Sequence, residues 1–230
     1  MEEIGSFKLG VVIVAGGSGR RMGSAMPKQF LLLDSEPILY RTIKIFAESF
    51  PTSQIVVVLP EEHIEYWRNL SSRFWPSFDH KIVAGGTERF YSVKAGIEAL
   101  SEGVDLIAVH DGVRPLVSAD MLDRCVKCAL SSGSAVPVVA LSDSVRQIGD
   151  DGVSHILSRS TLRAVQTPQI FDAITLRRAY AQGYDERFTD DSSLVEQMGE
   201  RIWLCEGDRR NIKITTMEDI HLAEIILGEF

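Results

Sequence analysis

Cysteine is scarce in this 230-residue chain, and the chain contains no long apolar run. Its three cysteines, Cys125, Cys128 and Cys205, are odd in number and low in density, which is typical of a protein kept in a reducing compartment. No apolar run approaches the roughly 18 residues that a membrane-spanning helix needs. Residues 1–8 contain two acids and no apolar core, so they are not expected to form a signal peptide. We therefore expect a cytoplasmic protein with no membrane partner.

A surplus of positive charge is also missing. The 24 Lys and Arg residues stand against 32 Asp and Glu, which gives a formal net charge of −8. This balance argues against a nucleic-acid partner or an acidic membrane surface. It allows a nucleotide substrate, because local cations set the potential inside a cleft. The length fits one large domain over residues 1–230.

Cys125 and Cys128 form a C-x-x-C pair, which could be half of a zinc site or a redox pair. No second C-x-x-C or H-x-x-x-H pair follows, and both residues lie inside an apolar pattern of helical spacing. We therefore interpret them as thiols that face the core.

Two familiar phosphate-binding motifs are absent as well. A dinucleotide fingerprint needs G-x-G-x-x-G, but Met22 stands where the third glycine belongs, and no G-x-x-x-x-G-K-[ST] string occurs. The glycine loop that is present reads A-G-G-x-G-x-R-M-G-(x)3-P-K. It follows Leu9–Ala15, an apolar run rich in Val and Ile that is typical of a strand buried on both faces.

This glycine loop predicts an anion-binding cradle. Gly16, Gly17 and Gly19 let the backbone turn tightly and lie close to a ligand, and cations follow within ten residues. We predict that the loop wraps a nucleoside triphosphate, with Arg21 and Lys28 on its phosphates. The alternative is a strand and turn with basic surface residues.

A second glycine pair precedes a predicted helix over residues 88–100. The segment reads Gly85-Gly86-Thr87-Glu88-Arg89, with Ser92 one turn later. A helix N-terminus after two glycines offers unpaired N–H donors, which suit the carbonyl and ring nitrogen of a pyrimidine, or an anion. A simple capping box with Thr87 as N-cap is the other reading, and the two can coexist.

Asp111 follows the predicted strand Val104–Val109, within His110-Asp111-Gly-Val-Arg114-Pro115. A carboxylate at the C-terminal tip of a central strand lies where open α/β sheets bind ligands. Mg²⁺ prefers one or two carboxylates plus phosphate oxygens, so Asp111 is a candidate metal ligand. The alternative is a turn or N-cap role, and we expect His110 to be structural.

Strands alternate with helices along most of the chain, which predicts a mostly parallel sheet with helices on both faces. The expected strands are Leu9–Ala15, Ile55–Leu59, Lys81–Ala84, Val104–Val109, Ala135–Ala140 and Arg201–Cys205. The expected helices are 37–49, 61–74, 88–100, 118–131, 172–182, 189–198 and 217–227.

Residues 141–166 break this alternation. Their pattern alternates around Gly149-Asp-Asp-Gly152, which is a hairpin signal. An isolated hairpin is marginal, so we expect this one to pack on a partner. The predicted fold is therefore a three-layer, doubly wound (Rossmann-like) α/β domain with a projecting β-hairpin arm.

The residues support one reaction class. Attack of a phosphate on the α-phosphate of a nucleotide needs no general base, because a phosphate with a second pKa of about 6 is already ionised at neutral pH. Positioning and charge neutralisation are the remaining demands. We assign them to Arg21, Lys28, Lys213 and Mg²⁺.

The glycine loop resembles the signature of the sugar-nucleotide pyrophosphorylase-type nucleotidyltransferases. With the later motifs, roughly Leu9 to Leu227 resembles the 2-C-methyl-D-erythritol 4-phosphate cytidylyltransferases. The resemblance implies that CTP and an alcohol phosphate give 4-diphosphocytidyl-2-C-methyl-D-erythritol and pyrophosphate, in non-mevalonate isoprenoid biosynthesis. Ribitol-5-phosphate cytidylyltransferase activity and a catalytically silent nucleotide-binding regulator are the alternatives. The departures are Gly112-Val113, where the family often has Ala-Ala, Thr87 for an acid and Ser144 for threonine.

The resemblance also implies roles for individual residues. Catalysis falls to Arg21, Lys28 and Lys213, and the metal falls to Asp111. Nucleotide binding falls to Ala15, Gly16, Gly17, Gly19, Gly86, Thr87, Arg89, Ser92, Asp111 and Gly112. Binding of the second substrate falls to Arg114, Ser144, Arg159, Thr167 and Thr189. The hairpin resembles the arm with which the family embraces a second subunit, so a homodimer with exchanged arms is expected, in which Ser144, Arg159 and Thr167 reach the neighbour's site.

Overall fold

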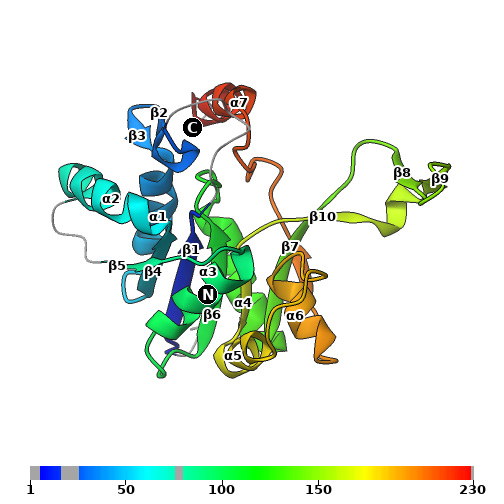
Figure 1. Ribbon diagram of the computed structural model, residues 1–230, viewed down its shortest axis with the longest axis horizontal. Helices are drawn as coiled ribbons and strands as arrows, with labels where there is room; N and C mark the ends of the chain where they lie inside the picture. The colour runs from blue at the N-terminus through cyan, green and yellow to red at the C-terminus, as the bar shows by residue number, and fades with distance from the viewer. Residues whose placement is uncertain (1–5, 17–25, 76–79, 229–230) are drawn as a thin grey trace.

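The computed structural model describes residues 6–16, 26–75 and 80–228 (Figure 1). Within these ranges eight strands form one sheet, in the order β10-β7-β11-β6-β1-β4-β5, with β12 also paired to β7. Their bounds are β1 Leu9–Val14, β4 Gln54–Leu59, β5 Lys81–Ala84, β6 Leu106–Asp111, β7 Ser134–Ala140, β10 Arg163–Val165, β11 Gln169–Asp172 and β12 Leu204–Glu206.

The strand directions confirm a mostly parallel sheet. Strands β6, β1, β4 and β5 run parallel to one another, and β12 is parallel to β7. Strands β10 and β11 are antiparallel to their neighbours. The register pairs Val14 with Asp111, so the carboxyl ends of β1 and β6 lie level at one edge of the sheet.

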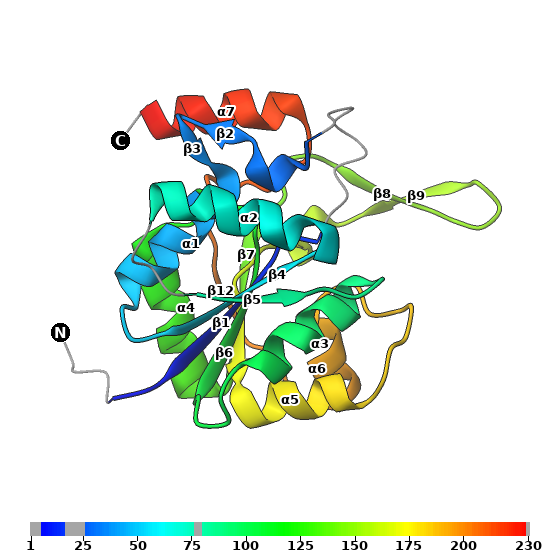
Figure 2. The ribbon, with the colours of Figure 1, turned by 60° about the vertical axis from the view of Figure 1, so that its left-hand side comes forward.

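Helices cover both faces of the sheet, which gives the three predicted layers (Figure 2). Successive residues of β1 alternate between them: Val11 and Ile13 pack under α1, α2 and α4, whereas Val12 packs under α3, α5 and α6. The helix bounds are α1 Ile38–Ser49, α2 Glu61–Phe74, α3 Arg89–Ala99, α4 Ala119–Ser132, α5 Ala173–Ala181, α6 Asp191–Gln197 and α7 Met217–Gly228.

A third apolar cluster lies beyond the carboxyl ends of the central strands. There α7 packs through Ile220 and Ala223 near Leu33 of β2 (Leu32–Leu33), which pairs with β3 (Glu36–Pro37). Ile214, just before α7, belongs to the same cluster. This packing anchors the C-terminal segment at the edge of the sheet where β1 and β6 end.

Local signals set the ends of helix α4. The Ser118 side chain accepts a hydrogen bond from the Met121 N–H at 3.3 Å, which caps the first turn. Gly133 ends the helix with φ of 84°, a left-handed conformation that glycine adopts without strain. With these ends α4 has the predicted length but lies one residue later in the chain than the predicted 118–131.

The predicted arm is present as a separate two-stranded sheet. Strand β8 (Val145–Ile148) pairs antiparallel with β9 (Ser154–Leu157), and the hairpin projects from the body (Figures 1 and 2). Its Ile148 and Ile156 side chains are 66% and 72% exposed. The arm therefore offers apolar side chains that its own body does not cover.

Several expectations for individual elements were wrong. Strands β10 and β11 were not predicted, and the last strand lies at Leu204–Glu206 rather than Arg201–Cys205. Asp111 is the final residue of β6 rather than a residue after it. On α2, the helical apolar spacing that includes Tyr66 and Trp67 favours burial of both side chains, but only Trp67 is buried and Tyr66 is 42% exposed.

The length and polarity of the helices also bear on membranes. Across the described part of the chain, none of them is both long and apolar enough to span a bilayer.

Candidate active site

A pocket of about 290 Å³ opens where β1 and β6 end and α3 begins. Strand ends and helix starts converge there, as expected for a ligand site in an open α/β sheet. Its walls come from both predicted glycine segments, β6 and the segment before α7. The lining residues are Val14, Ala15, Gly16, Lys28, Gln29, Gly86, Thr87, Glu88, Arg89, Ser92, Asp111, Val113, Lys213 and Thr215.

Asp111 is the buried acid of this pocket. Its Oδ2 lies 3.0 Å from Lys213 Nζ and 3.2 Å from Arg114 Nε. Burial alone would raise the pKa of Asp111, but the positive charges of Lys213, Arg89 and Arg114 outweigh it and hold the pKa well below its usual range. The carboxylate is therefore ionised at neutral pH and has no proton to donate as a general acid there.

Lys213 reaches Asp111 because one side-chain and one backbone hydrogen bond fix the segment before α7. Arg114 donates from Nη1 to the Asn211 carbonyl at 2.8 Å, and the Ile214 N–H donates to the Val113 carbonyl at 2.9 Å. These two bonds bracket Lys213. They place a cation in the site although it is about 100 residues from Asp111 in the chain.

Arg89 is paired with a buried acid, Asp191, and the sequence analysis did not predict this pair. Asp191, in the first turn of α6, is fully buried and accepts two hydrogen bonds from Arg89, at 2.9 and 2.6 Å. The Tyr180 hydroxyl donates to the same carboxylate at 2.5 Å. Burial would lower the pKa of Arg89, but the paired carboxylate outweighs it and raises the pKa above its ordinary value. The guanidinium is thus fixed and charged at the pocket wall.

The second glycine pair packs tightly around Ser92. The Ser92 Oγ accepts from the Gly86 N–H at 3.2 Å and donates to the Glu88 carbonyl at 3.1 Å. A Cβ on Gly86 would lie 2.3 Å from the Tyr91 Cβ, so only glycine fits there. The N-cap of α3 is Glu88 and its side chain makes no capping bond, so the proposed Thr87 cap was wrong. First-turn N–H groups of α3 are thus available to a ligand.

The glycine loop is described only at its two ends. Ala15, Gly16 and Lys28 line the pocket, whereas Gly17, Gly19 and Arg21 lie outside the described residues. Gln29, which the sequence analysis missed, lines the pocket too, and it donates from Nε2 to the Ala15 carbonyl at 2.8 Å. Gly112 lies behind Ala15: a Cβ on it would come within 2.9 Å of the Ala15 Cβ. It therefore lets β1 and β6 approach rather than lining the pocket.

The residues expected to bind the second substrate lie around the pocket rather than on its walls. Thr167 is buried beneath it, and its Oγ1 accepts from the Asp111 N–H at 3.1 Å. Thr189 is exposed before α6. Ser144 and Arg159 lie on the arm, where Arg159 donates to the Ser142 carbonyl. Arg114, although paired with Asp111, likewise does not appear among the described lining residues.

His110 is structural, as expected. It is fully buried, its Nε2 lies 3.2 Å from the Arg114 carbonyl and its Nδ1 lies 3.1 Å from Thr167 Oγ1. Burial lowers its pKa to about 4, so the ring is neutral at physiological pH.

The side chains around Asp111 fit a metal ion that takes most of its ligands from a bound nucleotide rather than from the protein. The described residues contain no group of three His, Cys, Asp or Glu side chains able to hold an ion. One ionised carboxylate can nevertheless supply a single oxygen to Mg²⁺, which takes the rest from phosphates and water.

The fold and site together define a class. A doubly wound sheet whose strand ends carry a glycine loop, fixed cations and one ionised carboxylate is the site of a nucleotidyltransferase. Residues 9–229 match the sequence profile of 2-C-methyl-D-erythritol 4-phosphate cytidylyltransferase, and the chain belongs to this family.

Individual relatives agree over nearly the full length. The chain is 44% identical to the 2-C-methyl-D-erythritol 4-phosphate cytidylyltransferase of Bacteroides fragilis, over 94% of this chain and 98% of that one. It is 45% identical to the Porphyromonas gingivalis protein of the same name, over 94% and 96%. The structure superposes on 4-diphosphocytidyl-2C-methyl-D-erythritol synthase from Anaerococcus prevotii with a TM-score of 0.83 at 26% identity, covering 96% and 99% of the two chains.

Proposed function

We propose that this protein transfers the cytidylyl group of CTP to the phosphate of 2-C-methyl-D-erythritol 4-phosphate. The products are 4-diphosphocytidyl-2-C-methyl-D-erythritol, an intermediate of isoprenoid precursor synthesis, and pyrophosphate. The observation that carries the proposal is the convergence of Lys28, Arg89 and Lys213 with one ionised carboxylate in a single pocket, within a chain of this family.

The reaction follows from these charges. A phosphate oxygen of the second substrate attacks the α-phosphorus of CTP, the bond from that phosphorus to the bridging oxygen breaks, and pyrophosphate leaves. Lys28 and Arg21, the latter outside the described residues, would neutralise the triphosphate. Lys213, held by Asp111, would attract the incoming phosphate. Mg²⁺ held by Asp111 would supply further charge neutralisation on the triphosphate.

The start of α3 suits the cytosine. Gly85 and Gly86 keep side chains out of this corner, and the first turn of α3 has no side-chain cap among the described residues. Backbone groups near Gly86 and Thr87, together with Ser92, would read the base edge by hydrogen bonding. A bulky polar side chain is not needed for this readout, because the backbone presents fixed donors and acceptors.

We also infer that the protein is a homodimer with exchanged arms. Ser144 and Arg159 lie on an arm that projects away from the body that carries it (Figure 1). The exposed apolar side chains of the arm would be buried against a partner surface. In a dimer with closed two-fold symmetry the exchange of arms is reciprocal. In this arrangement Arg159 would bind the second substrate's phosphate in the neighbouring subunit's site.

The free thiol state of Cys125, Cys128 and Cys205 supports a cytoplasmic setting for this reaction, because reducing compartments keep thiols unpaired.

The test is pyrophosphate release with paired substrates. CTP with 2-C-methyl-D-erythritol 4-phosphate should react clearly faster than UTP or ATP with the same acceptor, and faster than CTP with D-ribitol 5-phosphate. Equal rates with CTP and ATP would contradict the base assignment. A preference for D-ribitol 5-phosphate would contradict the acceptor, and the absence of any release would contradict catalysis.

A further inference from the structure

All three cysteines of the chain meet at a place remote from the pocket that holds Asp111. Cys125 and Cys128 lie one turn apart on α4, and Cys205 lies on β12. The Cys125 and Cys205 sulfurs are 3.5 Å apart, and all three residues are free thiols. Segments separated by 80 residues thus bring two nucleophilic groups into contact.

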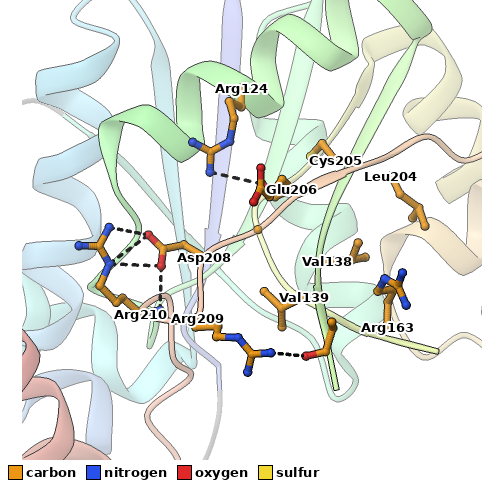
Figure 3. A pocket seen from close by; sticks show the side chains of 12 residues that line it. Arg124, Val138, Val139, Arg163, Leu204, Cys205, Glu206, Asp208, Arg209 and Arg210 are labelled. Atoms are coloured by element: carbon orange, nitrogen blue, oxygen red, sulfur yellow. Dashed lines mark hydrogen bonds and ion pairs between the residues drawn. The ribbon is translucent and has the colours of Figure 1, made fainter. Parts of the chain in front are cut away.

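The thiols differ in access. Cys125 is fully buried, as the sequence predicted, whereas Cys205 is half-buried. Cys205 lies on the wall of a second pocket, of about 840 Å³, between β7, β10, β12 and the loop after β12 (Figure 3). A reagent in this pocket can therefore approach Cys205. Cys125 does not line the pocket, but its sulfur lies next to that of Cys205.

The charges that line the second pocket favour an anionic ligand. Four arginines line it against two acids, and Asp208 is already paired with Arg210 at 3.0 Å. The Arg124 Nε is buried with no hydrogen-bond partner among the described residues. The side chains that line this pocket, besides glycine and aliphatic residues and Cys205, are Arg124, Arg163, Arg209, Arg210, Glu206 and Asp208.

The pKa values of the Cys205 and Cys125 thiols are shifted in opposite directions. A hydrogen bond from Cys125, aided by the charge of Arg124, lowers the pKa of Cys205 against the effect of burial. The same hydrogen bond, together with burial, raises the pKa of Cys125. The accessible sulfur is thus the one with thiolate character, which is the form that attacks disulfides.

We propose that Cys205 is a thiol–disulfide exchange site for a small anionic disulfide, with Cys125 as the resolving thiol. The Cys205 thiolate attacks one sulfur of the reagent, the reagent's S–S bond breaks, and one thiol is released as a mixed disulfide forms. Cys125 then attacks the Cys205 sulfur, its proton passes to the second departing thiolate, and a Cys125–Cys205 disulfide remains. The protein loses two electrons and two protons, and the reagent becomes two thiols.

The site can influence the catalytic segment because Cys205 is only eight residues before Lys213. Between them, Gln166 donates to the Asp208 carbonyl at 2.8 Å and Asn211 donates to the Thr167 carbonyl at 2.8 Å. A bond from β12 to α4 would fix the start of this segment. An adduct on Cys205 would instead crowd the pocket beside it.

The test uses oxidised glutathione on the reduced full-length protein, followed by peptide mapping without reductant. The wild type should give a peptide pair joined through Cys125 and Cys205, reversible by dithiothreitol. Cys125→Ser, or Cys125→Ala if the buried serine impairs folding, should accumulate a glutathione adduct on Cys205. Cys205→Ser should leave Cys125 and Cys128 unmodified over the same period, and Cys128→Ser should match the wild type.

Two further readouts separate this proposal from a merely exposed thiol. Cystamine, a cationic disulfide, should react with Cys205 at least about tenfold more slowly than glutathione disulfide does. Arg124→Gln should reduce this ratio of the two reaction rates. A Cys128–Cys205 link in the wild type would overturn Cys125 as the resolving thiol. Unchanged reaction in Cys205→Ser, or faster reaction with cystamine, would overturn the site itself.

Discussion

Asp111 carries the electrostatic balance of the candidate active site. Two cations contact the same carboxylate oxygen, and Arg89 adds a third positive charge nearby. The acid therefore has two jobs at once. It keeps Lys213 and Arg114 in place, and in the proposed function it would supply an ionised oxygen to a divalent cation.

Replacing Asp111 with asparagine tests both jobs. Asp111→Asn should fold but lower kcat by at least about a hundredfold, and it should raise the Mg²⁺ concentration needed for half-maximal rate. Kinetics across a magnesium titration measure both effects. Asp123→Asn, which breaks a surface pair with Lys127, is the matched control and should behave as wild type. Full activity of Asp111→Asn at ordinary magnesium would show that the metal is held elsewhere.

His110 predicts a loss of stability in mild acid. Burial lowers its pKa from 6.5 to about 4, so between these values the unfolded chain binds a proton that the folded chain excludes. The free energy of unfolding should fall as pH falls through this window, by roughly 3 kcal/mol at about 1.4 kcal/mol per unit, and the contribution is complete above about pH 6.5. Asp111, whose pKa is depressed, loses its contribution only below about pH 4.

Urea unfolding at pH 7 and 4.5, at one protein concentration, measures this slope. His110→Gln keeps a hydrogen-bonding side chain but does not titrate, so it should lose less stability than the wild type between the two pH values. An identical loss in both proteins would assign the acid sensitivity to other groups.

At the scale of elements, helix α6 secures helix α3. Asp191 at the start of α6 binds Arg89 at the start of α3, and Tyr180 of α5 joins the same carboxylate. Three helices on one face of the sheet thus share a single buried acid. The geometry of the pocket wall depends on their common packing.

Breaking this link should reduce stability and binding together. Asp191→Asn leaves a partly buried guanidinium without its counter-charge, so the free energy of unfolding should fall by about 3 kcal/mol. The KM for CTP should rise, because Arg89 lines the pocket. Urea titration and steady-state kinetics measure the two effects. Asp185→Asn, whose partner Arg187 is exposed, should change neither; an unchanged KM in Asp191→Asn would place Arg89 outside nucleotide binding.

Hydrophobic periodicity was sufficient to predict the bounds of elements whose pattern lies within their own residues. Residues 61–74 and Lys81–Ala84 were predicted with the bounds that the structure shows. Strand β11 was missed because its four residues, of which only Ile170 and Phe171 are apolar, are too few to show a period before the helix that follows. Its antiparallel place between β6 and β7 depends on distant partners. Asp191 was missed for the same reason: its partner is 102 residues away, and the sequence around it shows only a helix start.

Motif spacing was sufficient for much of the candidate site. The predicted residues Lys28, Arg89, Ser92, Asp111 and Lys213 do line one pocket. The sequence could not show that Thr167 supports Asp111 from below, or that Gln29 ties the end of the glycine loop, since both roles depend on backbone contacts rather than residue type.

At the scale of the whole molecule, exchanged arms predict complementation between inactive variants. Lys28→Ala and Arg159→Ala should each be inactive as homodimers. If Arg159 acts in the neighbour's site, each mixed dimer contains one doubly defective and one intact site. Random mixing makes about half of the dimers mixed, so activity should recover to about a quarter of wild type.

Subunit exchange must be shown independently, for example by native mass spectrometry of differently tagged chains. With exchange demonstrated, absence of recovery would mean that Arg159 serves its own subunit's site. That result would defeat the exchanged arms while leaving the cytidylyltransferase proposal intact.

The position of β11 also sets when a growing chain can complete its sheet. Strands β6 and β7 are made first, yet the strand that joins them is Gln169–Asp172, synthesised about thirty residues after β7. Until it emerges from the ribosome, β6 has unpaired backbone groups along one edge, and β7 also lacks β12, which is made later still. Such edges are templates for wrong pairing. The last third of the chain therefore shields the first two thirds during synthesis, and a stall before residue 169 would leave the nascent protein prone to aggregation.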